Sequence, residues 1–346
     1  MRGARMVSAL AMALFLEAIL YSFSQGAEKP FYQGKTVTIF TTGSPGGGFD
    51  QYARLLAKHM PRYISGQPQI IVSPLGGSSA IIEGNLIQSA KPDGLTLLMM
   101  HNQLYLEQLK RTEGVRFDLS RLTWIGNAGT DSLGLVMRDP FETLEEVRRA
   151  KNPLNFGASV GGASYMLPAL LKEALGLNFK IITGYSGGER RLALARGELD
   201  GIATSVGSAY RELRDELSTG RVQFVIQTGL PTKGGGHEPD PHISKVPLVR
   251  DMKMSPEAVA LTELVLGAHL YTRPLVGPPG MPEDRTRILR EAFMKALGDP
   301  NLLADAEKQR MNALPVDSAT IQTFYQKLIN QPPSVVKQIE KIFGPG

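Results

Sequence analysis

The 346-residue sequence contains no cysteine, one tryptophan and five histidines. The lack of cysteine excludes disulfide bonds, thiolate zinc sites, a cysteine nucleophile and a lipid-modified cysteine at a secretory cleavage site. Five scattered histidines do not form a recognisable catalytic or metal-binding pattern. Beyond the amino-terminal segment, no run of about 18 apolar residues is present, so nothing there is expected to span a membrane. With 42% hydrophobic and 21% charged residues, the chain is globular, and its length favours two domains.

The amino-terminal segment has the pattern of a secretory signal. Two arginines precede an almost wholly apolar stretch over residues 7–23, and small residues at 24–27 offer a cleavage site. Glu17 within the apolar stretch disfavours a membrane-spanning helix, and a retained anchor is the alternative. We predict a signal peptide over residues 1–26 and a periplasmic mature protein.

The net charge of +5 comes from basic residues that are interspersed with acidic ones. Nucleic-acid binding requires a contiguous basic face or stripe, so no nucleic acid is expected as a partner. A mildly basic protein suits an anionic ligand.

Three glycine-rich turns each follow a short β-type run and precede a helical pattern. They span residues 42–50, 74–79 and 184–188. Such a turn brings backbone N–H groups to a helix start, where the helix dipole also attracts an anion. No catalytic constellation accompanies the turns, so they favour a protein that binds an acid over one that transforms it.

Competing interpretations of these segments fit less well. A Walker A loop requires Gly-Lys followed by Ser or Thr, whereas Gly48 precedes Phe49 and Asp50, and the Rossmann glycine spacing is also absent. Residues 184–188 fit the spacing of a hydrolase nucleophile elbow, but no histidine or acid can be placed opposite the serine. Residues 237–242 contain metal-ligand types, but their prolines favour a solvated loop.

Strand and helix patterns alternate along the chain, which predicts an α/β fold with parallel sheets. Strand patterns at 35–41, 69–72 and 95–100 open a βαβαβ unit, and a second set of βα units follows. A helix capped near Thr143 and running to Lys151 is expected, as are a later strand over residues 265–271 and a helix around residues 283–297. We predict two α/β lobes, with residues 27–130 and 228–346 in lobe 1 and residues 131–227 in lobe 2.

Several short motifs recur in a fixed order through the mature chain. They lie at residues 31–35, 45–50, 52–56, 92–94, 183–188, 196–201, 246–249, 273–274 and 277–280. In this order and spacing the chain resembles the extracytoplasmic solute receptors of tripartite tricarboxylate transporters, the TctC or Bug family. The resemblance implies a periplasmic binding protein of type II topology, a Venus-flytrap whose two lobes close on a small organic carboxylate. It further implies delivery to the membrane permease subunits of such a transporter, without a cofactor or metal, and we expect a monomer.

The resemblance also implies which residues bind the ligand. In lobe 1, two loops would hold one carboxylate through backbone amides, and in lobe 2 other loops would contact the rest of the ligand. The predicted ligand-binding residues are Ser44, Gly46, Gly47, Gly48, Phe49, Asp50, Gly76, Gly77, Ser78, Ser79 and His101 in lobe 1, and Ser159, Ser164, Tyr185, Gly187 and Thr204 in lobe 2. No catalytic residue is predicted.

Several of these residues also have a purely structural interpretation. Asp50 and Ser164 are predicted helix N-caps, with ligand contact as the alternative. Tyr185 is expected either to pack on its turn or to line the site, and His101 either to face the ligand or to be structural. The family's second loop usually reads Pro-Gly-Ala-Gly-Gly or Pro-Gly-Ala-Gly-Ser, whereas residues 74–79 read Pro-Leu-Gly-Gly-Ser-Ser, so their register is open by one residue. A sensory co-receptor for a membrane kinase and an exported hydrolase are the alternative functions.

Overall fold

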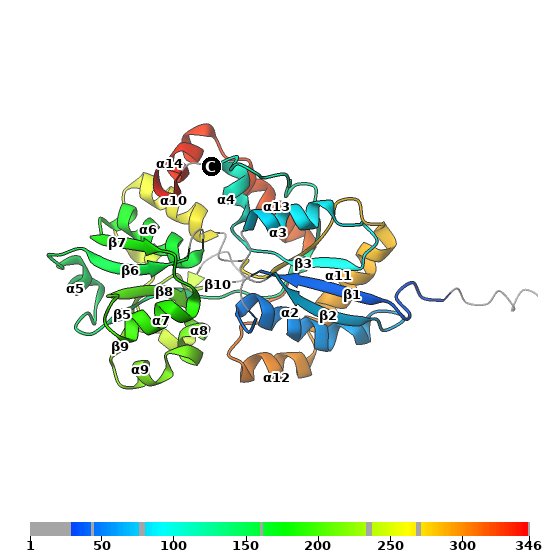
Figure 1. Cartoon of the computed structure of the whole chain (residues 1–346), viewed down its shortest axis with the longest axis horizontal. Coiled ribbons are helices and arrows are strands. Elements are labelled where there is room, and N and C mark those ends of the chain that lie inside the picture. The colour runs from blue at the N-terminus through cyan, green and yellow to red at the C-terminus, as the bar shows by residue number, and fades with distance from the viewer. Residues whose placement is uncertain are drawn as a thin grey trace, which may run out of the picture.

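The computed structural model describes residues 29–42, 45–75, 80–159, 162–232, 237–267 and 271–344. Two α/β lobes lie side by side, each built around its own sheet (Figure 1). Lobe 1 denotes the six-stranded sheet with the helices packed on it, and lobe 2 denotes the five-stranded sheet with its helices. The predicted signal peptide lies outside the described residues. Within the described part of the chain, no helix is both long and apolar enough to cross a membrane.

The lobe 1 sheet has the strand order β13-β4-β12-β3-β1-β2. β1 runs parallel to β2 and β3, whereas β12 runs antiparallel to β3 and β4. Every second residue of β1 from Val37 to Thr41 is buried, as expected for alternate side chains that face a helix layer. The strands are β1 (Thr36–Thr41), β2 (Gln69–Pro74), β3 (Thr96–Met99), β4 (Thr123–Asn127), β12 (Pro274–Gly277) and β13 (Val316–Asp317).

Helices cover both faces of this sheet. Tyr52 and Phe293 are buried in a cluster on one face, and on the other face the ring of Trp124 stacks on Tyr325, with 4.6 Å between ring centroids. The helical segments of lobe 1 are α2 (Gly48–His59), η1 (Met60–Tyr63), α3 (Ala80–Ser89), α4 (Leu104–Leu109), α11 (Glu283–Leu297), α12 (Pro300–Lys308) and α13 (Ser318–Ile329).

The lobe 2 sheet has the strand order β7-β6-β8-β5-β9. β6 runs parallel to β7 and β8, and β5 runs antiparallel to β8 and β9. The strands are β5 (Leu133–Arg138), β6 (Leu154–Ala158), β7 (Phe179–Thr183), β8 (Gly201–Ser205) and β9 (Val222–Gln227). The helices are α5 (Leu144–Arg148), α6 (Ala163–Leu175), α7 (Gly187–Ala195), α8 (Val206–Glu212) and α9 (Arg214–Ser218).

The chain between β9 and β12, and the carboxyl-terminal helix, connect the lobes. The elements are β10 (Leu230–Pro231), β11 (His237–Glu238), η2 (Pro241–Ile243), η3 (Val249–Asp251), α10 (Pro256–Gly267) and α14 (Pro333–Phe343). α10 and α14 pack against each other and against α6 of lobe 2 (Figure 1). The predicted division of the chain into lobes at residues 131 and 228 stays a prediction. It assigns α10 and α14 to lobe 1, although both helices contact α6 of lobe 2.

The strand predicted over residues 265–271 is wrong. Val265 and Leu266 belong to the last turn of α10, and residues 268–270 lie outside the described residues. Leu261 and Val265 are both buried, and their spacing of four places them on one helical face. The apolar run therefore fills a helix interface and does not extend as a strand. The predicted α/β class with two lobes is confirmed, but the expectation of parallel sheets is wrong in part, because each sheet also contains antiparallel strands.

Candidate ligand-binding site at the facing sheet edges

The parallel strands of lobe 1 end together at one edge of their sheet. Thr41 pairs with Pro74 on one side and with Met99 on the other, so the loops after β1, β2 and β3 leave from the same edge. β12 runs in the opposite direction, so Arg273, which precedes it, lies at this edge as well. We call this the lobe 1 edge.

The parallel strands of lobe 2 form a corresponding edge. Ala158 pairs with Thr183, and β8 runs parallel to β6, so the loops after β6, β7 and β8 leave together. We call this the lobe 2 edge. Residues 128–132 connect the end of β4 to the start of β5, and five residues span at most about 18 Å. The two edges are therefore close neighbours.

Side chains also join the two edges directly. Arg211 of α8 donates from Nη1 to the backbone oxygen of Gln309, at 3.4 Å, and the guanidinium of Arg310 lies 5.3 Å from the ring centroid of Tyr210. Figure 1 shows α8 on the side of lobe 2 that is turned toward α2 and α12 of lobe 1. These contacts hold the lobe 2 edge against the loop after α12.

The first glycine turn places Gly47 as the N-cap of α2, in extended conformation. Gly48 and Phe49 are the first two helical residues, and the first amides of a helix have no intrahelical acceptor. The amides of Gly47, Gly48 and Phe49 donate to no described residue. Gly46 has a φ of +77°, which a glycine adopts without strain. The turn thus presents three consecutive backbone donors.

Asp50 is not the N-cap that the sequence predicts. It lies within the first turn of α2, is 1% exposed, and its carboxylate accepts the N–H of Gly46 at 2.8 Å and the Nε–H of Arg54 at 2.7 Å. A carboxylate in the first turn is stabilised there by the helix dipole. Asp50 therefore holds the turn in place, and its ligand contact stays a prediction.

Aromatic rings and one guanidinium surround this turn. Phe49 stacks on His101 with 5.4 Å between ring centroids, and the guanidinium carbon of Arg273 lies 4.5 Å from the centroid of Phe49. A Cβ at Gly48 would lie 2.6 Å from Nη2 of Arg273, so a side chain at this position would displace the guanidinium. A side chain at position 48 is therefore accommodated only if this guanidinium shifts.

Arg273 is largely buried and paired. It forms an ion pair with Asp131, and its Nη1 donates to the backbone oxygen of Thr272 at 2.7 Å. The sequence singled out Arg273 only as part of a family motif and not as a site residue. The signal that was available is an arginine directly before a short apolar strand, residues 274–277, that enters a sheet from the site edge.

His101 is neutral at physiological pH. Burial, with the nearby positive charge of Arg273 as a smaller cause, lowers the pKa of His101 from 6.5 to about 4. Its Nδ1 accepts the backbone N–H of Gln103 at 3.3 Å, so the neutral ring carries its proton on Nε2. The ring is therefore a neutral hydrogen-bond donor beside the α2 turn.

The loop after β6 is held by two of the predicted lobe 2 residues. The N-cap of α6 is Gly162, so the predicted N-cap at Ser164 is wrong. The hydroxyl of the buried Ser164 instead accepts the N–H of Ser159 at 3.0 Å. This bond closes the loop, because it ties the residue that follows β6 to the second residue of α6.

The other predicted lobe 2 residues lie at the same edge. The N–H of Tyr185 donates to the oxygen of Ala158 at 3.2 Å, and its half-buried ring packs beside Gly157. Gly187 is the first residue of α7, and Thr204 lies one residue before the end of β8. The structure thus brings Ser159, Tyr185, Gly187 and Thr204 together, and their contact with a ligand stays a prediction.

The third glycine turn is closed by a capping box. Ser186 accepts the N–H of Glu189 at 3.4 Å, and the Glu189 carboxylate accepts the N–H of Ser186 at 2.7 Å. This second bond lowers the pKa of Glu189. The serine that matched a nucleophile elbow is therefore the N-cap of α7.

Five predicted residues, Ser44, Gly76, Gly77, Ser78 and Ser79, lie outside the described residues. In the part of the chain that the structure describes, no cluster of three or more histidines and carboxylates is placed to hold a metal ion. Two of the metal-ligand types noted in residues 237–242 contact each other, since Nδ1 of His242 lies 3.0 Å from the buried Asp240 carboxylate.

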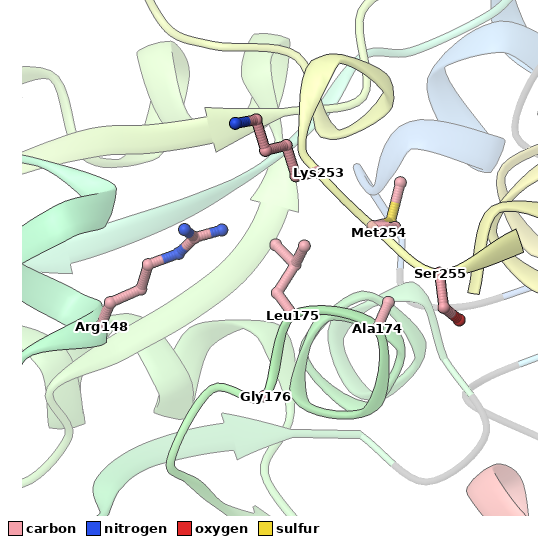
Figure 2. A pocket seen from close by; sticks show the side chains of 7 residues that line it. All are labelled: Arg148, Ala174, Leu175, Gly176, Lys253, Met254 and Ser255. Carbon is pink, nitrogen blue, oxygen red and sulfur yellow. The ribbon is translucent and has the colours of Figure 1, made fainter.

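A hollow of about 500 Å³ lies elsewhere on lobe 2. Figure 2 shows the residues that line it, with Arg148 to the left of Leu175 and Lys253 above it. It sits at the carboxyl-terminal end of α6, whereas the lobe 2 edge is at the amino-terminal end of that helix. Because ligands of open α/β sheets bind at the carboxyl ends of the strands, this hollow is not the candidate site.

Two lobes with facing strand edges define the periplasmic binding protein fold, and comparison with solved structures confirms it. The periplasmic binding protein BugD matches with a TM-score of 0.68 at 17% identity, over 90% of this chain and 98% of that chain. MatC from Rhodopseudomonas palustris, solved with bound malate, matches with a TM-score of 0.66 at 21% identity, over 87% of this chain and 99% of that chain.

Sequence comparison shows similarity to one family of receptors. A model described as tripartite tricarboxylate transporter family receptor, TctC, matches residues 52–216. The UPF0065 protein in the gbd 5′ region of Cupriavidus necator is 25% identical over 305 residues, which cover 85% of this chain and 84% of that protein. The chain is therefore similar to the TctC family of solute-binding receptors, and the resemblance that its motifs predict is confirmed.

Proposed function

We propose that this receptor binds a small organic carboxylate between the lobe 1 and lobe 2 edges. One observation carries the proposal: the consecutive amides of Gly47, Gly48 and Phe49 donate to no described residue at the start of α2. Hydrogen bonds from such donors to a carboxylate are charge-assisted, and each contributes about 1.5–3 kcal/mol. The helix dipole adds attraction for the same anion.

The side chains around the first glycine turn favour a noncovalently bound anion. The guanidinium of Arg273 lies over the turn, and the neutral ring of His101 offers an Nε2–H donor. MatC, a structural relative, was solved with malate, which is a small dicarboxylate. In this chain, a carboxylate would be held by hydrogen bonds from backbone donors, with no reacting side chain.

We further propose that the loaded receptor is periplasmic, acts as a monomer and passes its ligand to the permease of a tripartite tricarboxylate transporter. Ligand binding favours the closed arrangement because only there do both edges contact the ligand. The family assignment supports this role, since its members are receptors of such transporters.

A thermal-shift screen with organic acids tests the proposal. An acid present at about 100 times its dissociation constant adds about 2.7 kcal/mol to the stability of the folded protein. Gly47→Val places a branched side chain beside the free amides, so it is expected to abolish these shifts while the ligand-free protein stays folded. Gly298→Val, at the exposed carboxyl-terminal end of α11, is the matched control and should retain them. Shifts of wild-type size in Gly47→Val would remove the first turn from the site.

A further inference from the structure

Lobe 2 carries an arginine without a described counter-ion at the edge that faces lobe 1. Arg190 is the fourth residue of α7, and helical side chains point back toward the helix amino terminus. Its Nη2 lies 3.8 Å from the place that a Cβ would occupy at Gly187, the first residue of the helix. The guanidinium therefore lies over the turn that joins β7 to α7.

Two of the three guanidinium nitrogens of Arg190 have lost water without gaining a described acceptor. Its Nε and Nη1 atoms are both shielded from solvent, and neither bonds to any described residue. Burial, with the charge of Arg191 as a smaller cause, lowers the pKa of Arg190 to about 10, and the Glu212 carboxylate offsets only part of this shift. A buried charge without hydrogen-bond acceptors is costly. A bound ligand that supplied acceptors to these nitrogens would remove that cost.

The neighbouring arginine shows the opposite arrangement. Nη1 of Arg191 lies 2.6 Å from a carboxylate oxygen of Glu212, and both side chains are about one-third exposed. Glu212 is therefore already paired. Arg191 provides a matched control, since it has the same chemistry on the same turn of α7 but a partner of its own.

The position of Arg190 is fixed by packing. Its Cγ lies 3.3 Å from the Cβ position of Gly157 in β6, and the ring of Tyr185 lies 3.4 Å from the same position. A glycine at 157 thus leaves room for the arginine stem on the sheet, beside the aromatic ring. The stem is held along the sheet, and the guanidinium ends at the lobe 2 edge.

We propose that Arg190 binds an anionic group at the end of the ligand remote from lobe 1, and so selects dicarboxylates over monocarboxylates of the same length. This inference rests on the proposed function, in which the first turn of lobe 1 holds one carboxylate. The guanidinium presents its N–H donors as a fork that matches both oxygens of a carboxylate. Lobe 1 would then bind through amides, and lobe 2 through a side-chain charge.

Isothermal titration with acids of matched length tests this role. The probes are succinate with butyrate, glutarate with pentanoate, and adipate with hexanoate. The wild-type protein is expected to bind the dicarboxylate of at least one pair about ten- to a hundred-fold more tightly than its partner. Arg190→Met keeps the apolar stem over Gly157 and should lose this preference while its affinity for the monocarboxylate is unchanged.

Two further variants complete the experiment. Arg191→Met should keep the wild-type preference, because Arg191 is paired with Glu212. Arg190→Gln gives a second test without the charge, should the methionine variant fail to fold.

The outcomes separate the two proposals. A wild-type preference in Arg190→Met or Arg190→Gln, or equal wild-type affinity for both acids of each pair, overturns the role of Arg190 and leaves carboxylate binding intact. Failure of the wild-type protein to bind any carboxylate in the titrations and in the thermal-shift screen overturns the proposed function, and this inference with it.

Discussion

The two lobes share one strand plan and differ in the charges at their edges. Lobe 1 contains the order β2-β1-β3-β12-β4 and lobe 2 the order β7-β6-β8-β5-β9, and in each the fourth strand is the antiparallel one. At the lobe 1 edge Arg273 forms an ion pair with Asp131 and has one buried nitrogen, Nε, without a described acceptor, whereas at the lobe 2 edge Arg190 has two such nitrogens and no described ion pair. The same backbone plan thus supports one edge whose charge is satisfied and one whose charge is not.

The largest expected effect on stability comes from replacing Arg273, and replacing Arg190 is the comparison. Arg273→Met leaves the Asp131 carboxylate mostly buried without a counter-ion, which costs about 3–5 kcal/mol of unfolding free energy. Arg190→Met removes a charge that has no acceptor, so stability should stay the same or rise. Urea unfolding of the ligand-free proteins measures both. Equal losses in the two variants would contradict the difference between the edges.

A pH series sharpens the comparison, because residues 131–227 contain no histidine whereas the lobe 1 edge holds His101. The pKa of His101 is lowered from 6.5 to about 4 in the folded protein. Between these values the unfolded chain binds more protons, so stability falls as the pH drops through this window, by up to about 3 kcal/mol. His101→Gln should show a shallower fall between pH 6.5 and pH 4 in denaturant titrations. A fall as steep as that of the wild-type protein would refute this assignment.

A smaller effect on stability is expected from substitutions at the first residue of α2 in lobe 1 and of α7 in lobe 2. Gly48→Ala brings a Cβ to 2.6 Å from Nη2 of Arg273 and should cost about 1–3 kcal/mol. Gly187→Ala meets no atom closer than 3.7 Å, and should be neutral or stabilise by about 0.4–1 kcal/mol. Thermal unfolding compares the two variants. Equal melting temperatures would show that the guanidinium moves aside freely.

Local sequence patterns predicted the elements whose signals are themselves local. The helix predicted to be capped near Thr143 is α5, whose capping box pairs Thr143 with Glu146. The helix predicted around residues 283–297 has the bounds of α11. The glycine turn before α2 was also recognised, because turn glycines and a following amphipathic helix lie within a few residues of each other.

The features that sequence patterns missed depend on contacts between distant segments. Residues 265–267 look like a strand because they are apolar, and only packing on α6 and α14 shows that they are helical. Arg273 meets the α2 turn because β12 runs antiparallel to β3, and strand direction is a property of the whole sheet. Ser164 bonds to Ser159 because the helix begins two residues earlier than its serine suggests.

The carboxyl-terminal helix adds a constraint on any rotation of one lobe against the other. α13 belongs to lobe 1, yet α14, only three residues later, is packed on α6 and α10. The backbone thus passes between the lobes at a third place, residues 330–332, besides the two passages around β5 and β9. Any rotation of one lobe against the other therefore requires residues 330–332 to bend as well as residues 128–132, and a substitution that stiffens residues 330–332 would restrict that rotation.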